Sequence, residues 1–264
     1  MKTFFFTGTG NCLQVARGVG AQGEIISVPH FLRENENSSG RVTISADAVG
    51  IVFPNYWMAL PQPVVEFLEK TRFETDYLFA INTRGNLSVT IKSHLLQQAR
   101  KNGHRFSYYT QLNMPDNYVP MFDIAKEKQR FTESELAHSI EVIAADIQAR
   151  KQNLLGFAGL SFMRPITVGI IAKKNMADFS QHFYVTDACN GCGTCTQVCS
   201  AQSLKLAEGK PAFGNKCNGC LACTHLCPAN ALRMHKEVSA ERYLNPTVSV
   251  ADIIAAHRSP LMSS

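Results

Sequence analysis

Short apolar runs alternate with amphipathic stretches over residues 1–155. The runs have the length of buried strands, and the stretches repeat apolar residues every three or four positions, as helices do. Strands are expected at residues 2–7, 25–28, 49–53, 77–81 and 105–109, and helices at 61–69, 87–101 and 132–152. Between the second and third strands the chain is expected to be loop-like, with RENENSSG as its polar tip, so a full crossover helix is not expected there. The alternation predicts an α/β fold with a doubly wound parallel sheet.

A glycine-rich loop, TGTGNC at residues 7–12, lies between the first predicted strand and a segment with helical periodicity. Ligands of doubly wound sheets bind beyond the carboxyl ends of the strands, and a helix N-terminus favours phosphate. The loop is too short for G-x-x-x-x-G-K-[ST] and lacks G-x-G-x-x-G, which disfavours ATP and dinucleotides. A site for a single phosphate and a tight turn without a ligand both remain open.

Eight of the nine cysteines lie between Cys189 and Cys227. The pattern C-x2-C-x2-C-x3-C occurs in CNGCGTCTQVC and again in CNGCLACTHLC, and it matches bacterial ferredoxins, whose fourth cysteine ligates the other of two clusters. Zinc is an alternative because it commonly uses C-x2-C pairs. Disulfides are disfavoured because the first half of the chain has no disulfide framework. The predicted ligands are Cys189, Cys192, Cys195 and Cys227 for one [4Fe-4S] cluster, and Cys217, Cys220, Cys223 and Cys199 for the other.

The two cysteine runs form an internal repeat, and each continues into a short apolar segment, at residues 203–206 and 231–234, that is expected to form a small strand. The repeats differ after the fourth cysteine, where Pro228 follows Cys227 but Ser200 follows Cys199. A serine there adds a hydroxyl near one cluster without removing a ligand. His225 lies inside the second run, where a surface position or a hydrogen bond is favoured over ligation.

Four further motifs resemble a known family. FFFTGTGN (residues 4–11) resembles the FMN phosphate loop of flavodoxins, and FPNYWMALP (53–61) and NTRGN (82–86) resemble the loops on either side of the flavin ring. With MPDNYV (114–119) and the double cysteine motif, the chain is similar over nearly its whole length to flavodoxin–ferredoxin fusion proteins, also called EFR family ferredoxins, of anaerobes.

The resemblance implies four segments. These are a flavodoxin-like domain with a five-stranded sheet (1–155), a linker (156–182), a small α+β dicluster ferredoxin domain (183–236) and a tail with a short helix (237–264, helix at 250–257). It also implies FMN-binding residues: Thr7, Thr9, Gly10, Asn11 and Cys12 at the phosphate, Pro54, Asn55, Tyr56 and Trp57 beside the ring, and Thr83, Arg84 and Gly85 on its other side.

The chain departs from the family at two places in these loops. Cys12 stands where related loops often carry serine or threonine, and Met58-Ala59 follow Trp57 where relatives often have glycines. Each motif also has a simpler interpretation. Trp57 is either a ring-stacking aromatic or a core residue, Arg84 is either near the flavin or solvated, and Cys12 is favoured as a small buried filler.

Composition narrows the function. The formal net charge is +5, and two oxidised clusters with thiolate ligands, each of about −2, would offset most of it. No basic stripe interleaved with aromatics suggests nucleic acid, and no apolar run reaches the length of a membrane span, so a cytoplasmic protein is expected. The favoured function is electron transfer between FMN, two [4Fe-4S] clusters and an external redox partner. Alternatives are a flavin-dependent reductase of a small organic substrate, for which Asp116 and Tyr118 are candidate proton donors, and a redox-sensing binding module.

Overall fold

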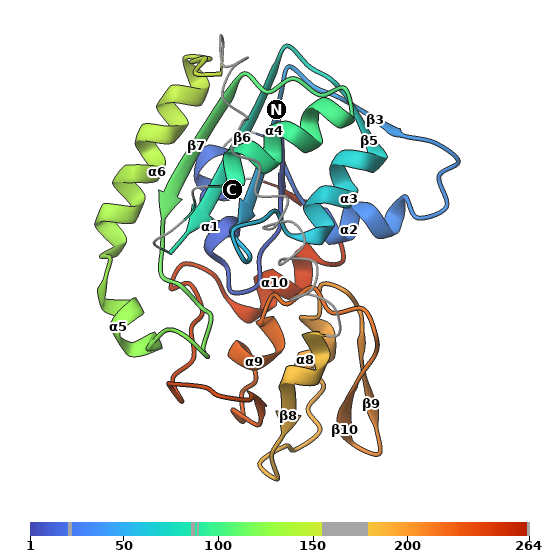
Figure 1. The fold of residues 1–264 in the computed structure, drawn as a ribbon, viewed down its shortest axis with the longest axis vertical. Helices are drawn as coiled ribbons and strands as arrows, with labels where there is room; N and C mark the ends of the chain where they lie inside the picture. The colour runs from blue at the N-terminus through green and yellow to red at the C-terminus, as the bar shows by residue number, and fades with distance from the viewer. Residues whose placement is uncertain (21–22, 86–87, 89, 155–178, 263–264) are drawn as a thin grey trace.

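The computed structural model describes residues 1–20, 23–85, 88, 90–154 and 179–262. The predicted linker at 156–182 therefore lies mostly outside the described residues, as does Asn86 of the NTRGN motif. Figure 1 shows a larger α/β unit and, below it, a smaller unit with the eight clustered cysteines. We call the smaller part, residues 179–234, the cysteine-rich unit.

Five parallel strands form the centre of the larger unit: β1 (Lys2–Phe5), β2 (Glu24–Ser27), β4 (Ala48–Pro54), β6 (Tyr77–Arg84) and β7 (Tyr108–Asn113). The central strands β4 and β6 carry continuous apolar runs, AVGIVF and YLFAI, because helices cover both faces of the sheet. Phe4 in β1, for example, pairs in register with Ile26 in β2 and Ile51 in β4. The order β2-β1-β4-β6-β7 is the flavodoxin-like order 2-1-3-4-5 of a doubly wound sheet, which confirms the predicted fold class.

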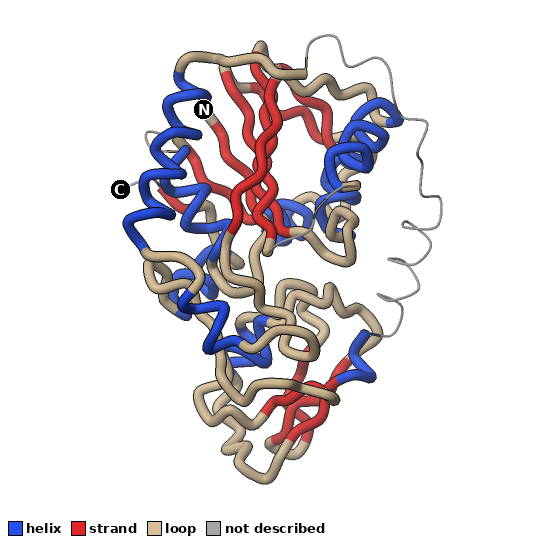
Figure 2. The backbone as a smooth tube through the Cα atoms, turned by 60° about the vertical axis from the view of Figure 1, so that its left-hand side comes forward, coloured by secondary structure: helices blue, strands red, loops and turns tan. Residues whose placement is uncertain are grey.

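Helices lie on the two faces of this sheet, as Figures 1 and 2 show. On one face are α1 (Asn11–Val19), α6 (Glu133–Gln148) and α10 (Val250–Ala256), which share one apolar core. On the other are α2 (Val28–Glu34), α3 (Gln62–Lys70) and α4 (Ile91–Lys101), around a second core. A capping box of Thr132 and Glu135 fixes the start of α6. The short α5 (Ile124–Gln129) follows the loop after β7.

Several elements differ from the sequence prediction, and the strand expected at 105–109 is β7, at Tyr108–Asn113. The stretch after β2 was predicted to be loop-like, but Pro29 in the first turn starts α2 there, since proline is preorganised for that position. A parallel pair, β3 (Val42–Ser45) and β5 (Thr71–Glu74), lies outside the main sheet. The two-residue β12 (Leu261–Met262) adds an antiparallel strand next to β2. The tail thereby becomes part of the flavodoxin-like sheet.

The cysteine-rich unit contains η1 (Phe179–His182), β8 (Phe183–Val185), α8 (Thr194–Gln197), β9 (Leu204–Ala207), β10 (Lys210–Phe213), α9 (Ala222–His225) and β11 (Leu232–Met234). The two small strands predicted after the cysteine runs are β9 and β11. They do not pair with each other, because β9 forms a hairpin with β10 and β11 pairs with β8. The unit lies below the sheet, at the carboxyl ends of the parallel strands (Figure 1).

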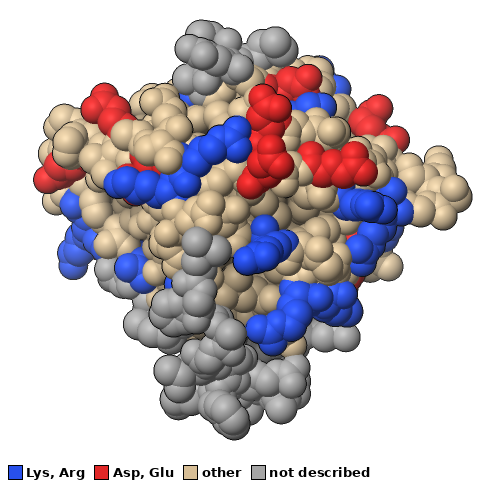
Figure 3. All heavy atoms as spheres, turned by 90° about the horizontal axis from the view of Figure 1, so that it is seen from above, with Lys and Arg blue, Asp and Glu red and all other residues tan. Residues whose placement is uncertain are grey.

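Charges are mixed on the end of the molecule away from the cysteine-rich unit. Figure 3 views that end, and Lys and Arg lie next to Asp and Glu there without forming a field of one sign. Among the described residues, no helix has both the length and the apolar character needed to cross a bilayer.

Candidate functional site

A cleft lies where β1, β4, β6 and β7 end. Ten of the twelve residues predicted to bind FMN line it: Thr7, Thr9, Asn11, Cys12, Pro54, Asn55, Tyr56, Thr83, Arg84 and Gly85. The loop after β7 completes the lining with Met114, Pro115, Asp116 and Asn117. The strand ends bring these four loops together at the position where doubly wound sheets bind their ligands.

Gly10 and Trp57 are the two predicted residues that do not line the cleft. Gly10 instead caps α1, with a φ of 98° that glycine adopts without steric cost. Its N–H donates to Thr7 Oγ1 at 3.0 Å, which closes the loop on itself. Trp57 packs edge to face on Tyr118, with ring centroids 5.0 Å apart. Trp57 is partly buried, at the edge of the apolar cluster of the cysteine-rich unit.

The phosphate-loop segment aims the N-terminus of α1 toward the cleft. Thr7 and Thr9 are buried, and Asn11 is part of the first turn of the helix. The first N–H groups of a helix have no partner within the helix and carry its positive dipole end. Together with the threonine hydroxyls they suit a dianionic phosphate, so the residues present fit the flavin phosphate that the sequence predicts.

Cys12 is buried under the loop, where its Sγ lies 3.1 Å from Thr83 Oγ1. Burial, only partly offset by this hydrogen bond, raises the pKa of the thiol to about 12. The thiol therefore stays protonated near neutral pH, and a thiol of that kind is a poor nucleophile. Cys12 therefore fills a small buried space under the loop, and its side chain contacts Thr83 near the end of β6.

The turn after Tyr56 carries backbone strain. Tyr56 and Ala59 exchange two backbone hydrogen bonds, of 3.2 and 2.9 Å, across Trp57 and Met58. Trp57 and Met58 have φ of 53° and 58°, a region that glycine occupies at far lower cost. The glycines that relatives often carry after the ring-side aromatic thus match the conformation adopted here by Met58. Ala59 falls outside the strained pair.

Asp116 is a partly buried acid that lines the cleft. Its Oδ1 accepts from the Tyr118 N–H at 2.9 Å, and a Cβ on Gly85 would come within 2.4 Å of its Oδ2. Burial raises the pKa of this carboxyl above its usual range. Tyr118, the other candidate proton donor, lies against Trp57 and does not line the cleft. Asp116 thus lies where its carboxyl would face a ligand bound in the cleft.

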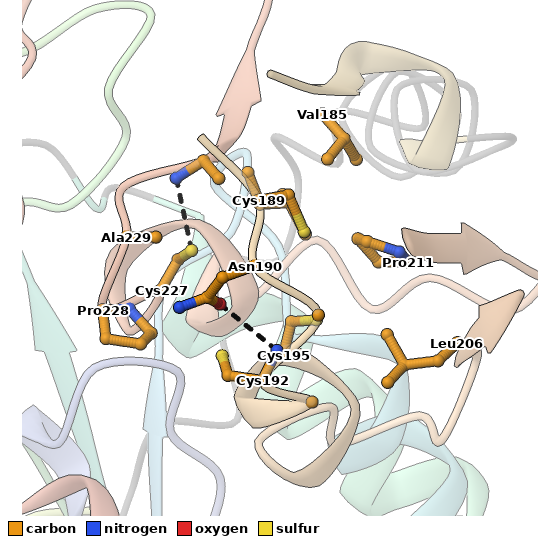
Figure 4. Close-up of a pocket in the computed structure, with 14 residues that line it drawn as sticks. Val185, Cys189, Asn190, Cys192, Cys195, Leu206, Pro211, Cys227, Pro228 and Ala229 are labelled. Atoms are coloured by element: carbon orange, nitrogen blue, oxygen red, sulfur yellow. Dashed lines mark hydrogen bonds between the residues drawn. The ribbon is translucent and has the colours of Figure 1, made fainter. Parts of the chain in front are cut away.

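Eight cysteines form two sites in the cysteine-rich unit. The outer thiol site is a cavity lined by Cys189, Cys192, Cys195 and Cys227 (Figure 4). The inner thiol site is made by Cys199, Cys217, Cys220 and Cys223, whose charges act on one another. Each site takes three cysteines from one repeat and the fourth from the other, as the sequence predicts. All nine cysteines of the chain are described, and none of them forms a disulfide.

The surroundings of the thiols decide whether the two sites fit a metal cluster. Burial and then the charge of Cys227 raise the pKa of Cys195 to about 11, and burial followed by Cys220 and Cys217 raises that of Cys223 well above its ordinary value. Thiols with raised pKa values, such as these two, ionise near neutral pH only when cations bind them, as iron does. Backbone N–H groups already point at the sulfurs: Ser203 donates to Cys199 Sγ and Ala231 to Cys227 Sγ, both at 3.3 Å. The donor sets therefore fit [4Fe-4S] clusters.

No group of three or more His, Cys, Asp or Glu side chains within the described parts of the chain converges on a point where a single metal ion could bind. A cubane cluster does not require such convergence, because each of its four irons takes one thiolate.

Sequence reasoning missed the contribution of the tail to the cleft. Asn245 is fully buried and donates its N–H to Thr9 O at 2.8 Å and its Nδ2 to Asn11 Oδ1 and Gln14 Oε1. Tyr243 donates its hydroxyl to the same Asn11 oxygen at 2.6 Å. No local pattern in the sequence marks these residues, since their partners lie more than 200 positions away.

His225 makes hydrogen bonds and is buried. Its Nε2 lies 2.7 Å from Asn117 O, and its Nδ1 accepts from the Tyr243 N–H at 3.0 Å. These contacts require the neutral tautomer with the proton on Nε2, and burial lowers the pKa of the imidazole to about 4. His225 therefore ties the second cysteine run to the cleft loop after β7 and to the tail.

No known protein family matches the sequence, and no curated protein matches it either. The structure is similar to several solved flavoproteins and flavodoxin-like proteins at low identity. Rubredoxin oxygen:oxidoreductase from the anaerobe Desulfovibrio gigas has 15% identity and a TM-score of 0.35, over 56% of this chain and 36% of that one, so the similarity spans about a third of its length. A putative flavoprotein from Bacteroides uniformis has 17% identity and a TM-score of 0.31, over 48% and 94% of the chains. A WrbA-like flavodoxin from Agrobacterium tumefaciens has 13% identity and a TM-score of 0.31, over 56% of this chain and 95% of that one.

Proposed function

We propose that this chain is an electron-transfer protein of the flavodoxin–ferredoxin type that binds FMN in the cleft and a [4Fe-4S] cluster at each thiol site. The observation that carries the proposal is the pair of thiol sites, each completed by a cysteine from the opposite repeat and one of them adjoining the cleft. An FMN takes up two electrons and each cluster one, so the combination links two-electron to one-electron chemistry. An external redox protein supplies or removes the electrons.

The residues have distinct roles in this function. The phosphate would lie against the α1 N-terminus and the hydroxyls of Thr7 and Thr9, while the loops at residues 54–57 and 83–85 border the ring. The N–H groups of Ser203, Gly219 and Ala231 donate to cysteine sulfurs and stabilise their negative charge. The apolar side chains packed around the inner site exclude water from it.

Analysis of anaerobically purified protein tests this function. About eight iron, eight sulfide and one FMN per chain are expected, and Cys217→Ala is expected to reduce the iron content by about half. Gly40→Ala is a suitable control, because nothing lies within 4 Å of a Cβ at this position. Iron below about four per chain in the wild-type protein, or one zinc per thiol site, would overturn the cluster assignment.

A flavin-dependent reductase is the second candidate, and Asp116 favours it because this carboxyl lines the cleft, as a general acid must. In a reductase, Asp116→Asn would abolish turnover of a small organic acceptor while leaving FMN bound. In a carrier, the same variant would still pass electrons between one-electron donors and acceptors at an unchanged rate.

A further inference from the structure

The two thiol sites have different surroundings. The cavity of the outer site is lined only by residues 185–232, and Cys192 is exposed at its edge. In the inner site, Cys223 is buried, and Cys220 packs against the apolar cores on both faces of the parallel sheet. The outer site therefore faces solvent, and the inner site faces the flavodoxin-like unit.

The inner site touches the predicted phosphate loop directly. A Cβ on Gly8 would lie 2.0 Å from the carbonyl oxygen of Cys220 and 3.0 Å from its carbonyl carbon. Both atoms are backbone and cannot rotate away, so only glycine permits this approach. Gly8 stands between Thr7 and Thr9, which line the cleft. A cluster ligand and the flavin site are thus in van der Waals contact through main chain.

Two further contacts hold the inner site against the cleft. His225, between the ligands Cys223 and Cys227, bonds to the carbonyl of Asn117 at 2.7 Å. Asn117 in turn lines the cleft and donates its Nδ2 to Thr9 Oγ1 at 3.0 Å. The second cysteine run is therefore fixed to the cleft at Gly8 and again at Asn117.

We propose that the inner site exchanges electrons with the flavin cleft across the Cys220–Gly8 contact, and that the outer site, around Cys192, is where an external one-electron carrier protein gives or takes electrons. This order of electron transfer, between carrier and outer site, then inner site, then flavin, rests on the proposed function. In the reducing direction, two reduced carriers each lose one electron at the outer site, and the FMN gains two electrons along with two protons from solvent. The cysteine ligands are unchanged at the end.

The surface around the outer site suits a brief encounter with such a carrier. Leu206 lines the cavity of the outer site and is 43% exposed, although it is large and apolar. The nearby Asp187 and Lys210 pair at 3.6 Å and offset each other's charge. Weak redox complexes bury small interfaces, and an apolar, nearly neutral face predicts association that depends little on salt.

Gly8→Ala tests the inner contact, with Gly40→Ala as the matched control, since a Cβ at Gly40 meets nothing within 4 Å. Stopped-flow reduction by reduced methyl viologen would be followed at separate cluster and flavin wavelengths, on protein with its iron and FMN contents verified. Gly8→Ala is expected to slow flavin reduction severalfold and leave cluster reduction unchanged, and Gly40→Ala is expected to change neither. An unchanged flavin phase in Gly8→Ala would overturn the proposal.

A magnetic measurement on the wild-type protein tests the order independently of turnover and of the folding of Gly8→Ala. The cluster signals of dithionite-reduced protein are assigned by their loss in Cys192→Ala or in Cys217→Ala. A soluble dysprosium chelate is expected to speed the spin relaxation of the Cys192-dependent signal far more than that of the other. If the chelate speeds the relaxation of both signals equally, or that of the Cys217-dependent signal more, the proposed order of the two sites is overturned. Failure of the proposed function would appear differently, as missing iron or FMN.

Discussion

Ser200 shows how one residue can distinguish the two thiol sites. It occupies the place that Pro228 holds in the other repeat. Its hydroxyl donates to Cys220 Sγ at 3.6 Å and accepts from Asn218 Nδ2 at 3.0 Å. A donor on a ligand sulfur stabilises the more negative, reduced cluster and so raises its potential. The residue that breaks the sequence repeat thus gives the inner site a bond that a proline could not supply.

Ser200→Ala is therefore expected to lower the reduction potential of one cluster by a few tens of millivolts, the equivalent of about 1 kcal/mol for one electron. Spectroelectrochemical titration measures the shift. Ser203→Ala, which keeps the Ser203 N–H bond to Cys199 Sγ, is a control for removing a neighbouring hydroxyl. A potential identical to wild type in Ser200→Ala would mean that this hydroxyl does not act on the cluster.

The C-terminal tail makes structural contacts that no pattern in its sequence predicts. It packs α10 against α1, pairs β12 with β2, and places Asn245 under the phosphate loop. Arg17 of α1 and Asp252 of α10 also form an ion pair at 2.5 Å. Because these contacts hold the loop rather than the ligand, the tail is a support of the cleft.

Asn245→Ala is expected to lower the free energy of unfolding by about 1–3 kcal/mol, since it removes two side-chain hydrogen bonds and takes this donor from the buried Gln14 Oε1, while Asn11 Oδ1 keeps the Tyr243 hydroxyl. Urea unfolding measures the loss, with the exposed Asn37→Ala as control. The same variant is expected to weaken FMN binding more than riboflavin binding, because the loop it supports faces the phosphate. Equal weakening of both flavins would refute that role.

At the scale of the molecule, the tail and the cysteine-rich unit meet the flavodoxin-like unit around Arg33. Its guanidinium donates to the carbonyls of Ser200 and His257, at 3.4 and 2.5 Å. Burial and the positive charge of Arg33 lower the pKa of His257 to about 4. This imidazole also faces the Val198 backbone, whose hydrogen bond partly offsets the decrease in pKa, His30, whose own pKa is lowered, and the Ser27 hydroxyl, 3.5 Å from its Nδ1.

This junction predicts acid sensitivity. The fold favours neutral His257, whereas the unfolded chain takes up its proton near pH 6.5. The stability from the neutral form is therefore complete above about pH 6.5 and is lost as the pH falls toward 4, by on the order of 2 kcal/mol. His257→Gln is expected to flatten the decline in unfolding free energy between pH 7 and 4.5. A decline as steep as that of wild type would exclude His257 as its source.

Much of the fold and of the candidate site could be predicted because the relevant signals are local. A strand buried on both faces is a contiguous apolar run, so β1, β4 and β6 are visible in the sequence. Three ligands of each thiol site fall within seven residues, and the loop motifs named ten residues that do line the cleft. Strand ends and the start of α2 were less predictable, since tertiary packing decides where a short element stops.

The sequence by itself determined the doubly wound α/β pattern, the glycine loop and the two sets of cysteines, because each depends on residues close together in the chain. Only the tertiary structure decided that Cys220 lies on Gly8, that Asn245 lies under Thr9 and that β12 extends the sheet beside β2. Such contacts join segments about 200 residues apart. They depend on main-chain shape and on burial, which leave no periodic or spaced pattern in either segment.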